Sequence, residues 1–371
     1  MLFDEYDAPL IDVLHEEKNF VELRKVMQSF YAPLKLSNPY LRFVFITGIT
    51  KFSQLSIFSS LNNIENISLD NEYASICGIS EEEIHSELDY DVELLSAKNG
   101  ITKVAMYAKL KETYDGYHFS IKSPDIYNPY SLLTALKKGR IDQFWFETGT
   151  PTMLIRMMDK FRVQAGEIGN YRASSRDFDT PTESLKSMTP LLYQSGYITI
   201  KSYDAESDRY LLDIPNKEVR EGLMESLLPN YVTNDCLAKN VFVDAAIDFR
   251  HDDIGTALTR LKTYFSTLPY ADNINTEGHY QHMLYIMFDL MGGHPTLETR
   301  TSNGRIALTL RSKTTIYIIE LKINDTAQSA LDQINSKDYS SLYALEHLAI
   351  VKIGIKFDTS KRTIEEWVVE R

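Results

Sequence analysis

Residues 316–322, Ile-Tyr-Ile-Ile-Glu-Leu-Lys, decide the fold of this chain. The first four positions are β-branched or aromatic and predict a buried strand, which then delivers two charged side chains at its end. Because side chains alternate along a strand, Glu320 and Lys322 point to the same face. Burying a carboxylate or an ammonium is costly unless the group is paired or in use. This strand end is therefore the first candidate site.

The segments around this strand predict an α/β domain. Residues 304–310 form a second strand pattern, and Glu277 opens a helical run that continues over 278–291. A further helical pattern follows at 326–338. The order of helix with Glu, strand, strand, Glu-x-Lys strand and helix resembles the PD-(D/E)XK nuclease superfamily.

This resemblance implies a Mg²⁺ site and metal-dependent phosphodiester cleavage. By it, Glu320 and Glu277 would hold the metal, and Lys322 would orient water or stabilise the developing charge. The family's strand phrase Gly-Arg-Ile-Asp, however, ends here in Ala307. A magnesium ion needs oxygen ligands at roughly 2.1 Å, and a methyl group supplies none. Glu298 and Asp325 do not occupy the matching position.

Two interpretations of the site follow from Ala307. In the first, Glu320, Lys322 and Glu277 are the remaining catalytic residues of an impaired nuclease, which contacts DNA through the C-terminal domain. In the second, the domain is a catalytically silent binding or regulatory module in which Glu320 and Lys322 pair with each other. A metal bound between Glu320 and the strand of residue 307 distinguishes the two.

Composition limits the remaining classes of function. The chain has 371 residues, enough for two or three domains, with 43% hydrophobic and 25% charged residues. Its net charge of -13 argues against a broad phosphate-binding surface. Two cysteines are too few for a disulfide framework or a cysteine-based zinc site. Without a long apolar run or a signal-peptide pattern, the chain is expected in the cytoplasm, away from membranes.

Residues 1–7, Met-Leu-Phe-Asp-Glu-Tyr-Asp, look like the end of a strand followed by acids. The apolar run at 43–48 predicts a parallel strand beside it. The first segment resembles a Walker B sequence, which implies that Asp4 lies on the metal side and that Glu5 polarises water for ATP hydrolysis. The alternative is an exposed acidic terminus.

Further motifs extend this resemblance over the chain. Tyr-Asp-Gly-Tyr at 114–117, Tyr-Asn-Pro at 127–129 and Thr-Gly-Thr-Pro at 148–151 resemble predicted AAA-ATPase-like proteins that carry a C-terminal PD-(D/E)XK domain. No G-x-x-x-x-G-K-[ST] occurs, and the lookalike at 48–51 lacks the glycine-rich loop. The resemblance implies that the chain starts after the P-loop and does not bind ATP alone. A third interpretation is an ATPase half completed by another chain, which would cover an apolar sheet edge beside residues 1–3.

The predicted fold class is α/β in three parts. Residues 1–150 are a truncated P-loop-ATPase-like parallel sheet region, 151–235 a winged-helix-like lid, and 240–371 the nuclease-like domain. In the middle part, a helix with Leu185 and Met188 leads into a strand pattern over 191–200, a polar turn and a second strand. The acidic turn favours a structural lid over DNA reading.

One long helix is predicted over 241–264, carrying His251, Asp252 and Asp253. Adjacent residues on a helix face different directions, so no metal site is predicted there.

Overall fold

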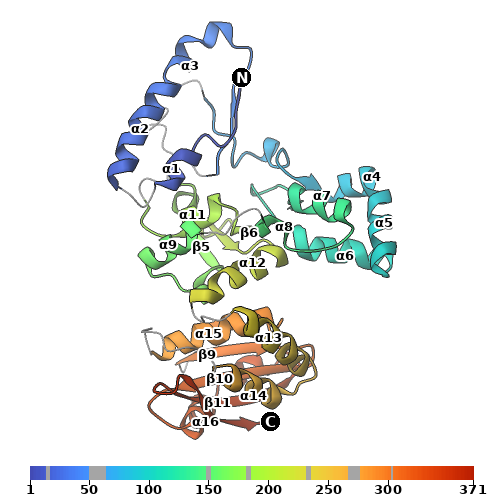
Figure 1. The fold of residues 1–371 in the computed structure, drawn as a ribbon, viewed down its shortest axis with the longest axis vertical. Helices are drawn as coiled ribbons and strands as arrows, with labels where there is room; N and C mark the ends of the chain where they lie inside the picture. Colours follow the sequence, from blue (N-terminus) through green and yellow to red (C-terminus); the bar gives the residue numbers. More distant parts are fainter. Residues whose placement is uncertain are drawn as a thin grey trace. The chain divides into compact units, whose positions relative to one another are not determined.

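The computed structural model describes residues 1–13, 17–49, 64–147, 152–180, 185–230, 235–265, 276–301 and 304–371. The chain divides into two compact units (Figure 1). One contains residues 1–163 and 168–222, and the other contains 164–167 and 223–371. No helix within the described ranges is both long and apolar enough to span a membrane. The motif at 148–151 and the second half of the lookalike at 48–51 lie outside the described residues.

A five-stranded mixed sheet in the order β12-β11-β10-β9-β8 forms the centre of the second unit (Figure 1). Its central strand, β10, pairs parallel with β11 and antiparallel with β9. This strand confirms the prediction from residues 316–322, since all of its residues are buried except Lys322. The strands are β8 (Thr296–Thr301), β9 (Gly304–Arg311), β10 (Thr315–Lys322), β11 (Ala349–Asp358) and β12 (Thr363–Glu370).

Helices cover both faces of this sheet. On one face, the Tyr317 ring lies 5.4 Å from that of Phe249, and the Tyr280 ring stacks on Phe357 at 4.3 Å. On the other face, the even-numbered isoleucines of β10 form a core with Leu331. The helices of this unit are α13 (Asp235–Arg250), α14 (Ile254–Phe265), α15 (Glu277–Leu290) and α16 (Ala327–Ser336). The helices predicted from Glu277 and after residue 326 are confirmed.

The single helix predicted over 241–264 is wrong, because α13 and α14 are separated by a turn at residues 251–253. Asp252 takes a left-handed conformation there, with φ of 57°. Its carboxylate accepts hydrogen bonds from Ser312 at 2.8 Å, Tyr317 at 2.7 Å and Thr314. These donors belong to the β9–β10 hairpin, so long-range contacts support the break.

The first unit begins with a two-stranded parallel sheet, as the sequence predicts. In it, β1 (Leu2–Phe3) pairs with β2 (Phe45–Ile46). Helices α1 (Ala8–Asp12), α2 (Glu17–Tyr31) and α3 (Pro33–Leu36) connect the two strands. A small core forms from Leu10, Phe20, Met27, Tyr31 and Leu34.

A group of helices and a short strand pair follow in the same unit. The elements are β3 (Ile79–Ser80), α4 (Glu81–Glu87), α5 (Asp89–Asn99), α6 (Lys103–Tyr114), β4 (Ile126–Tyr127), α7 (Pro129–Lys138) and α8 (Phe144–Glu147). Asn128 caps α7 by accepting the Ser131 N–H at 3.2 Å, which gives the Tyr-Asn-Pro motif a structural role.

A three-stranded antiparallel sheet in the order β5-β7-β6 completes this unit. Its elements are α9 (Thr152–Phe161), β5 (Tyr171–Ala173), α10 (Ser175–Phe178), α11 (Thr189–Gln194), β6 (Thr199–Asp204), β7 (Arg209–Asp213) and the start of α12 (Lys217–Leu227). The strand pattern expected over 191–200 is partly wrong, since residues 191–194 are helical and the strand begins at Thr199. Pro190 lies in the first turn of α11, where its fixed φ favours a helix start.

Candidate functional site at the end of strand β10

Glu320 is a buried acid near the end of the central strand. Only 3% of the residue is exposed. Regular pairing between β9 and β10 ends at Ile319 and Leu308, one residue before Glu320. The carboxylate Oε1 accepts the backbone N–H of Ala307 at 3.1 Å. The Glu320 side chain therefore continues the contact between the two strands.

Gln281 holds the other backbone group of the same residue. Its amide nitrogen donates to the carbonyl oxygen of Ala307. Gln281 comes from α15 and is buried. Gln281, Glu320 and Ala307 thus form a clamp, in which the first two side chains bind the Ala307 backbone. Sequence reasoning missed Gln281, although its position four residues after Glu277 was a usable signal.

Glu277 belongs to the same helix face as Gln281, because residues four apart on a helix are neighbours. It is the first residue of α15, and Thr276 caps this helix by accepting the His279 N–H at 3.3 Å. Glu277 is half-buried. Glu277 therefore lies one turn of α15 before Gln281, the residue that contacts Ala307.

Lys322 ends β10 on the same face as Glu320 and is half-buried. In the parallel register it lies beside Lys356, and Glu320 lies beside Gly354. A Cβ on Gly354 would lie 2.0 Å from the Ala327 carbonyl oxygen, so the first turn of α16 packs directly on this row of the sheet. The ends of β10 and β11 therefore carry two neighbouring lysines, Lys322 and Lys356, beside the row on which the first turn of α16 packs.

Asp325 lies just before α16. The Thr326 N–H holds the pKa of the Asp325 carboxyl below its usual range, helped by Ser329 and by the charges of Lys322 and Lys356. Asp325 therefore binds the backbone at the start of α16, and the nearby Lys322 charge favours the ionised form of its carboxyl. The side chain of Glu298 lies outside the described residues.

These residues do not fit a magnesium ion well. A hard divalent cation prefers about six oxygen ligands. Ala307 offers only its carbonyl, which already accepts from Gln281, and one oxygen of Glu320 already accepts from Ala307. In the part of the chain that the structure describes, no three His, Cys, Asp or Glu side chains gather into a metal-binding group.

The Walker B-like acids lie in the other unit, and both are exposed. Asp4 accepts from the Thr47 hydroxyl at 2.5 Å, across the β1–β2 pair. Glu5 has a left-handed backbone, with φ of 49°. The acid that sequence reasoning missed is Asp7, which is fully buried and accepts the Ile49 N–H at 3.0 Å. Its position three residues after Asp4 gave no distinguishing signal.

The sheet, its covering helices and the Glu-x-Lys strand define a nuclease-fold domain. Residues 275–367 match the family model of the PD-(D/E)XK nuclease superfamily, and residues 1–58 match the model described as predicted AAA-ATPase. The chain therefore joins an AAA-ATPase-like region to a C-terminal PD-(D/E)XK domain.

Among curated proteins, the chain is similar to "Uncharacterized protein in vnfD 5'region" of Azotobacter chroococcum mcd 1. The two are 29% identical over an alignment that spans all of this chain and 71% of the relative. No solved structure matches the chain.

Proposed function

We propose that the C-terminal domain is a nuclease-fold DNA-binding module whose metal-dependent cleavage is impaired. The observation that carries this proposal is the clamp on Ala307. Both backbone polar groups of Ala307 bind protein side chains, and the residue brings no carboxylate to the site. An ion there would have to compete with these hydrogen bonds.

In this proposal the site residues have separate roles. Glu320 keeps β9 and β10 together at the point where their pairing stops, and Gln281 ties β9 to α15. Lys322 provides a cation at the strand end, where it attracts a DNA phosphate. Glu277 remains as the second carboxylate that a restored metal site would need. The catalytic roles predicted for Glu277, Glu320 and Lys322 stay predictions.

The test compares the native chain with Ala307→Asp. Calorimetry measures binding of Mg²⁺ and Mn²⁺, and cleavage of single- and double-stranded DNA is followed in parallel. Ala307→Ser is the matched control, because it adds a polar atom without a carboxylate. We expect metal binding and cleavage only with Asp at 307. Cleavage by the native chain that is lost in Glu320→Gln would contradict impairment.

DNA binding is tested separately by fluorescence anisotropy at two salt concentrations. We expect weak binding that decreases with salt and weakens further in Lys322→Ala. Lys313→Ala, on the β9–β10 hairpin, is the control. Equal affinity of the native chain and Lys322→Ala for DNA would show that Lys322 does not contribute to the proposed interface.

A second candidate function concerns the first unit: an ATPase half completed by another protein chain. The parallel pair β1–β2 supports it, because parallel sheets are normally covered on both faces. Here Leu2 is 73% exposed and Phe43 is 61% exposed. Other large apolar side chains of this region are also exposed, namely Met1, Val26, Phe30, Leu36 and Tyr40.

This second proposal predicts that ATP does not bind to the isolated chain. It also predicts self-association or capture of a partner through the exposed apolar residues. Light scattering of the native chain and of Leu2→Asp tests the surface, and titration with a fluorescent ATP analogue tests the nucleotide. ATP binding by the isolated chain would contradict the need for a completing chain.

We also propose that the β5-β7-β6 sheet with α10 and α11 is a winged-helix-like lid. The order of helices and strands supports this, and the turn between β6 and β7 is acidic, which disfavours DNA reading. The three-part division at 150 and 235–240 and the cytoplasmic location stay predictions.

A further inference from the structure

Two lysines lie side by side near the ends of the parallel strands β10 and β11. Lys322 is the direct register partner of Lys356. Residues paired in this way point to the same face of the sheet, here the face that packs on α16. Like charges directly opposite each other on neighbouring strands are destabilising. The groups that balance each ammonium therefore decide whether this pair is structural or has another use.

Lys356 has an acid of its own. Its ammonium lies 2.9 Å from the Glu365 carboxylate, and the Glu365 side chain is 40% exposed. Two further acids act on Lys356 through their charges, but both bind backbone groups. Glu366 accepts the N–H of Ala327 at 3.2 Å, and Asp358 accepts N–H groups of the turn that follows β11. Glu365 is therefore the acid that binds Lys356 directly, in a partly exposed ion pair that salt screens.

Lys322 has no such partner. Within the described ranges its ammonium makes no hydrogen bond and no ion pair. The carboxylate of Asp325 accepts the Thr326 N–H at 2.8 Å, at the start of α16. This hydrogen bond lowers the pKa of Asp325, and the charges of Lys322 and Lys356 both add to the effect. The two ammonium groups therefore act at one place, the first turn of α16.

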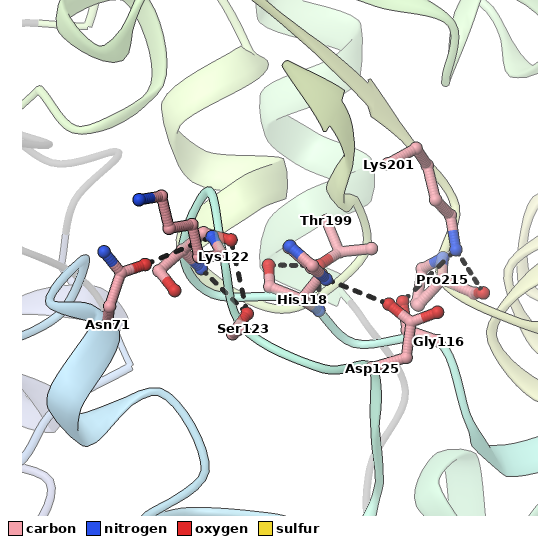
Figure 2. Close-up of polar contacts among 10 residues, drawn as sticks. Asn71, Gly116, His118, Lys122, Ser123, Asp125, Thr199, Lys201 and Pro215 are labelled. Atoms are coloured by element: carbon pink, nitrogen blue, oxygen red, sulfur yellow. Dashed lines mark hydrogen bonds and ion pairs between the residues drawn. The ribbon is translucent and has the colours of Figure 1, made fainter.

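A lysine of the first unit shows what a structural role looks like in this chain (Figure 2). The Lys201 ammonium donates to the carbonyl oxygens of Gly116 at 3.2 Å and Pro215 at 2.7 Å. It thereby joins two segments that are about a hundred residues apart in sequence. Lys322 makes no contact of this kind among the described residues, so folding alone does not explain a second cation beside Lys356.

We propose that Lys356 is a second phosphate-binding residue, and that one DNA phosphodiester group bridges Lys322 and Lys356 in place of Glu365. This inference rests on the proposed DNA-binding function and adds to it one contact and one competing acid. A phosphodiester has two free oxygens and one negative charge, so it can accept from two neighbouring ammonium groups. When no DNA is bound, Glu365 occupies the Lys356 ammonium and thereby lowers the affinity for DNA.

The first experiment measures the affinity of the full chain for a labelled double-stranded oligonucleotide by fluorescence anisotropy in 50 and 200 mM KCl. It compares the native chain with Lys322→Ala, Lys356→Ala and the control Lys122→Ala. Lys122 is an exposed lysine of the first unit, and its backbone N–H donates to the Asn71 side chain at 3.1 Å (Figure 2). We expect Lys356→Ala to weaken binding about threefold more in 50 mM than in 200 mM salt, which is the loss of one phosphate contact. Lys122→Ala is expected to change neither affinity.

The second experiment tests the competing acid. Glu365→Gln keeps the size of the side chain and removes its charge, so we expect DNA binding in 50 mM salt to become about threefold tighter. In the Lys356→Ala background the same substitution should have no such effect. Glu346→Gln is the matched control, because Glu346 pairs with Arg311 at 2.7 Å beside the start of β10, at the opposite end of this strand. Equal gains from Glu365→Gln and Glu346→Gln would show a general charge effect and overturn the role of Glu365.

The results separate this inference from the proposed function. Native affinity in folded Lys356→Ala, together with weakened binding in Lys322→Ala, would overturn the inference and leave the proposed function intact. Weakened binding in Lys356→Ala alone would overturn the bridge between the two lysines. A native chain that does not bind DNA in 50 mM salt would overturn both. Circular dichroism checks that each variant is folded, and Lys356→Gln, which keeps much of the side chain, replaces Lys356→Ala if that variant does not fold.

Discussion

Two strands in this molecule deliver acids at their ends, and the structure treats them in opposite ways. β10 lies in the middle of a five-stranded sheet with helices on both faces, and Glu320 is buried at its end. β1 is one of two short paired strands, and Asp4 and Glu5 beyond it are exposed. The same sequence pattern, apolar residues followed by acids, therefore gives a buried carboxylate at the end of β10 and two exposed carboxylates directly after β1.

The largest expected effect is the difference in stability loss between a truncation in β10 and a truncation in β1. Ile318→Ala removes a fully buried side chain and should lower the free energy of unfolding by about 3 kcal/mol. Leu2→Ala, at an exposed position, should change it by less than about 0.5 kcal/mol. Urea unfolding measures the first through Trp367 in a Trp145→Phe background and the second through Trp145 in a Trp367→Phe background. Similar losses would show that β1 is buried in solution.

The next effect tests the clamp. Glu320→Ala should cost about 2 kcal/mol, because the Ala307 N–H loses its acceptor and stays buried. Glu320→Gln keeps an oxygen at the same place and should cost clearly less. Urea unfolding followed by Trp367 measures both. If the Ala variant were as stable as the native chain, the hydrogen bond to Ala307 would have no structural importance.

A smaller effect concerns the turn that supports the sheet. Asp252→Asn should cost about 1 kcal/mol at pH 7, since the hydroxyls of Ser312, Thr314 and Tyr317 then bind a neutral oxygen. Burial raises the pKa of the Asp252 carboxyl, but the hydrogen bonds from Thr314, Tyr317 and Ser312 together outweigh burial, so the pKa is lowered. The contribution of the charge is therefore complete above pH about 4 and is lost as pH falls through the lowered pKa. The free energies of unfolding of the native chain and of Asp252→Asn should converge at pH values below the lowered pKa of Asp252. A difference that widens there would contradict the role assigned to Asp252.

The smallest effect is expected at the first strand's acid. Asp4→Asn should change the free energy of unfolding by less than about 0.5 kcal/mol, because Asp4 is exposed and its Thr47 contact tolerates an amide oxygen. Thermal unfolding followed by Trp145 measures this. A large loss would mean that Asp4 is enclosed in solution and that the two strand ends are more alike than the structure shows.

Local patterns were sufficient for much of the fold. The periodicity of 316–322, the acid at the start of α15 and the helix after residue 326 predicted β10, α15 and α16, and the family matches support the same domain. The parallel pairing of β1 and β2 was also predicted, because short apolar runs of this kind suit adjacent parallel strands.

The errors share a physical cause. The break between α13 and α14 depends on Asp252 binding hydroxyls about sixty residues later in the chain, so no local pattern reveals it. The contact between Gln281 and Ala307 is likewise tertiary. Sequence reasoning identified Glu320 but could not show that its carboxylate binds the residue that replaces the expected Asp.

The parallel pairing of β10 with β11 has a consequence for the order of folding. β8, β9 and β10 follow one another closely in the chain, so their antiparallel contacts close small loops early. β11 can add only after the chain has passed through α16 and η6 (Tyr339–Tyr343), which closes a much longer loop at greater entropic cost. Until then the edge of β10 is open to other strands. During synthesis, the edge of β10 that later pairs with β11 is therefore exposed for a time. A strand of a neighbouring nascent chain can pair with this edge.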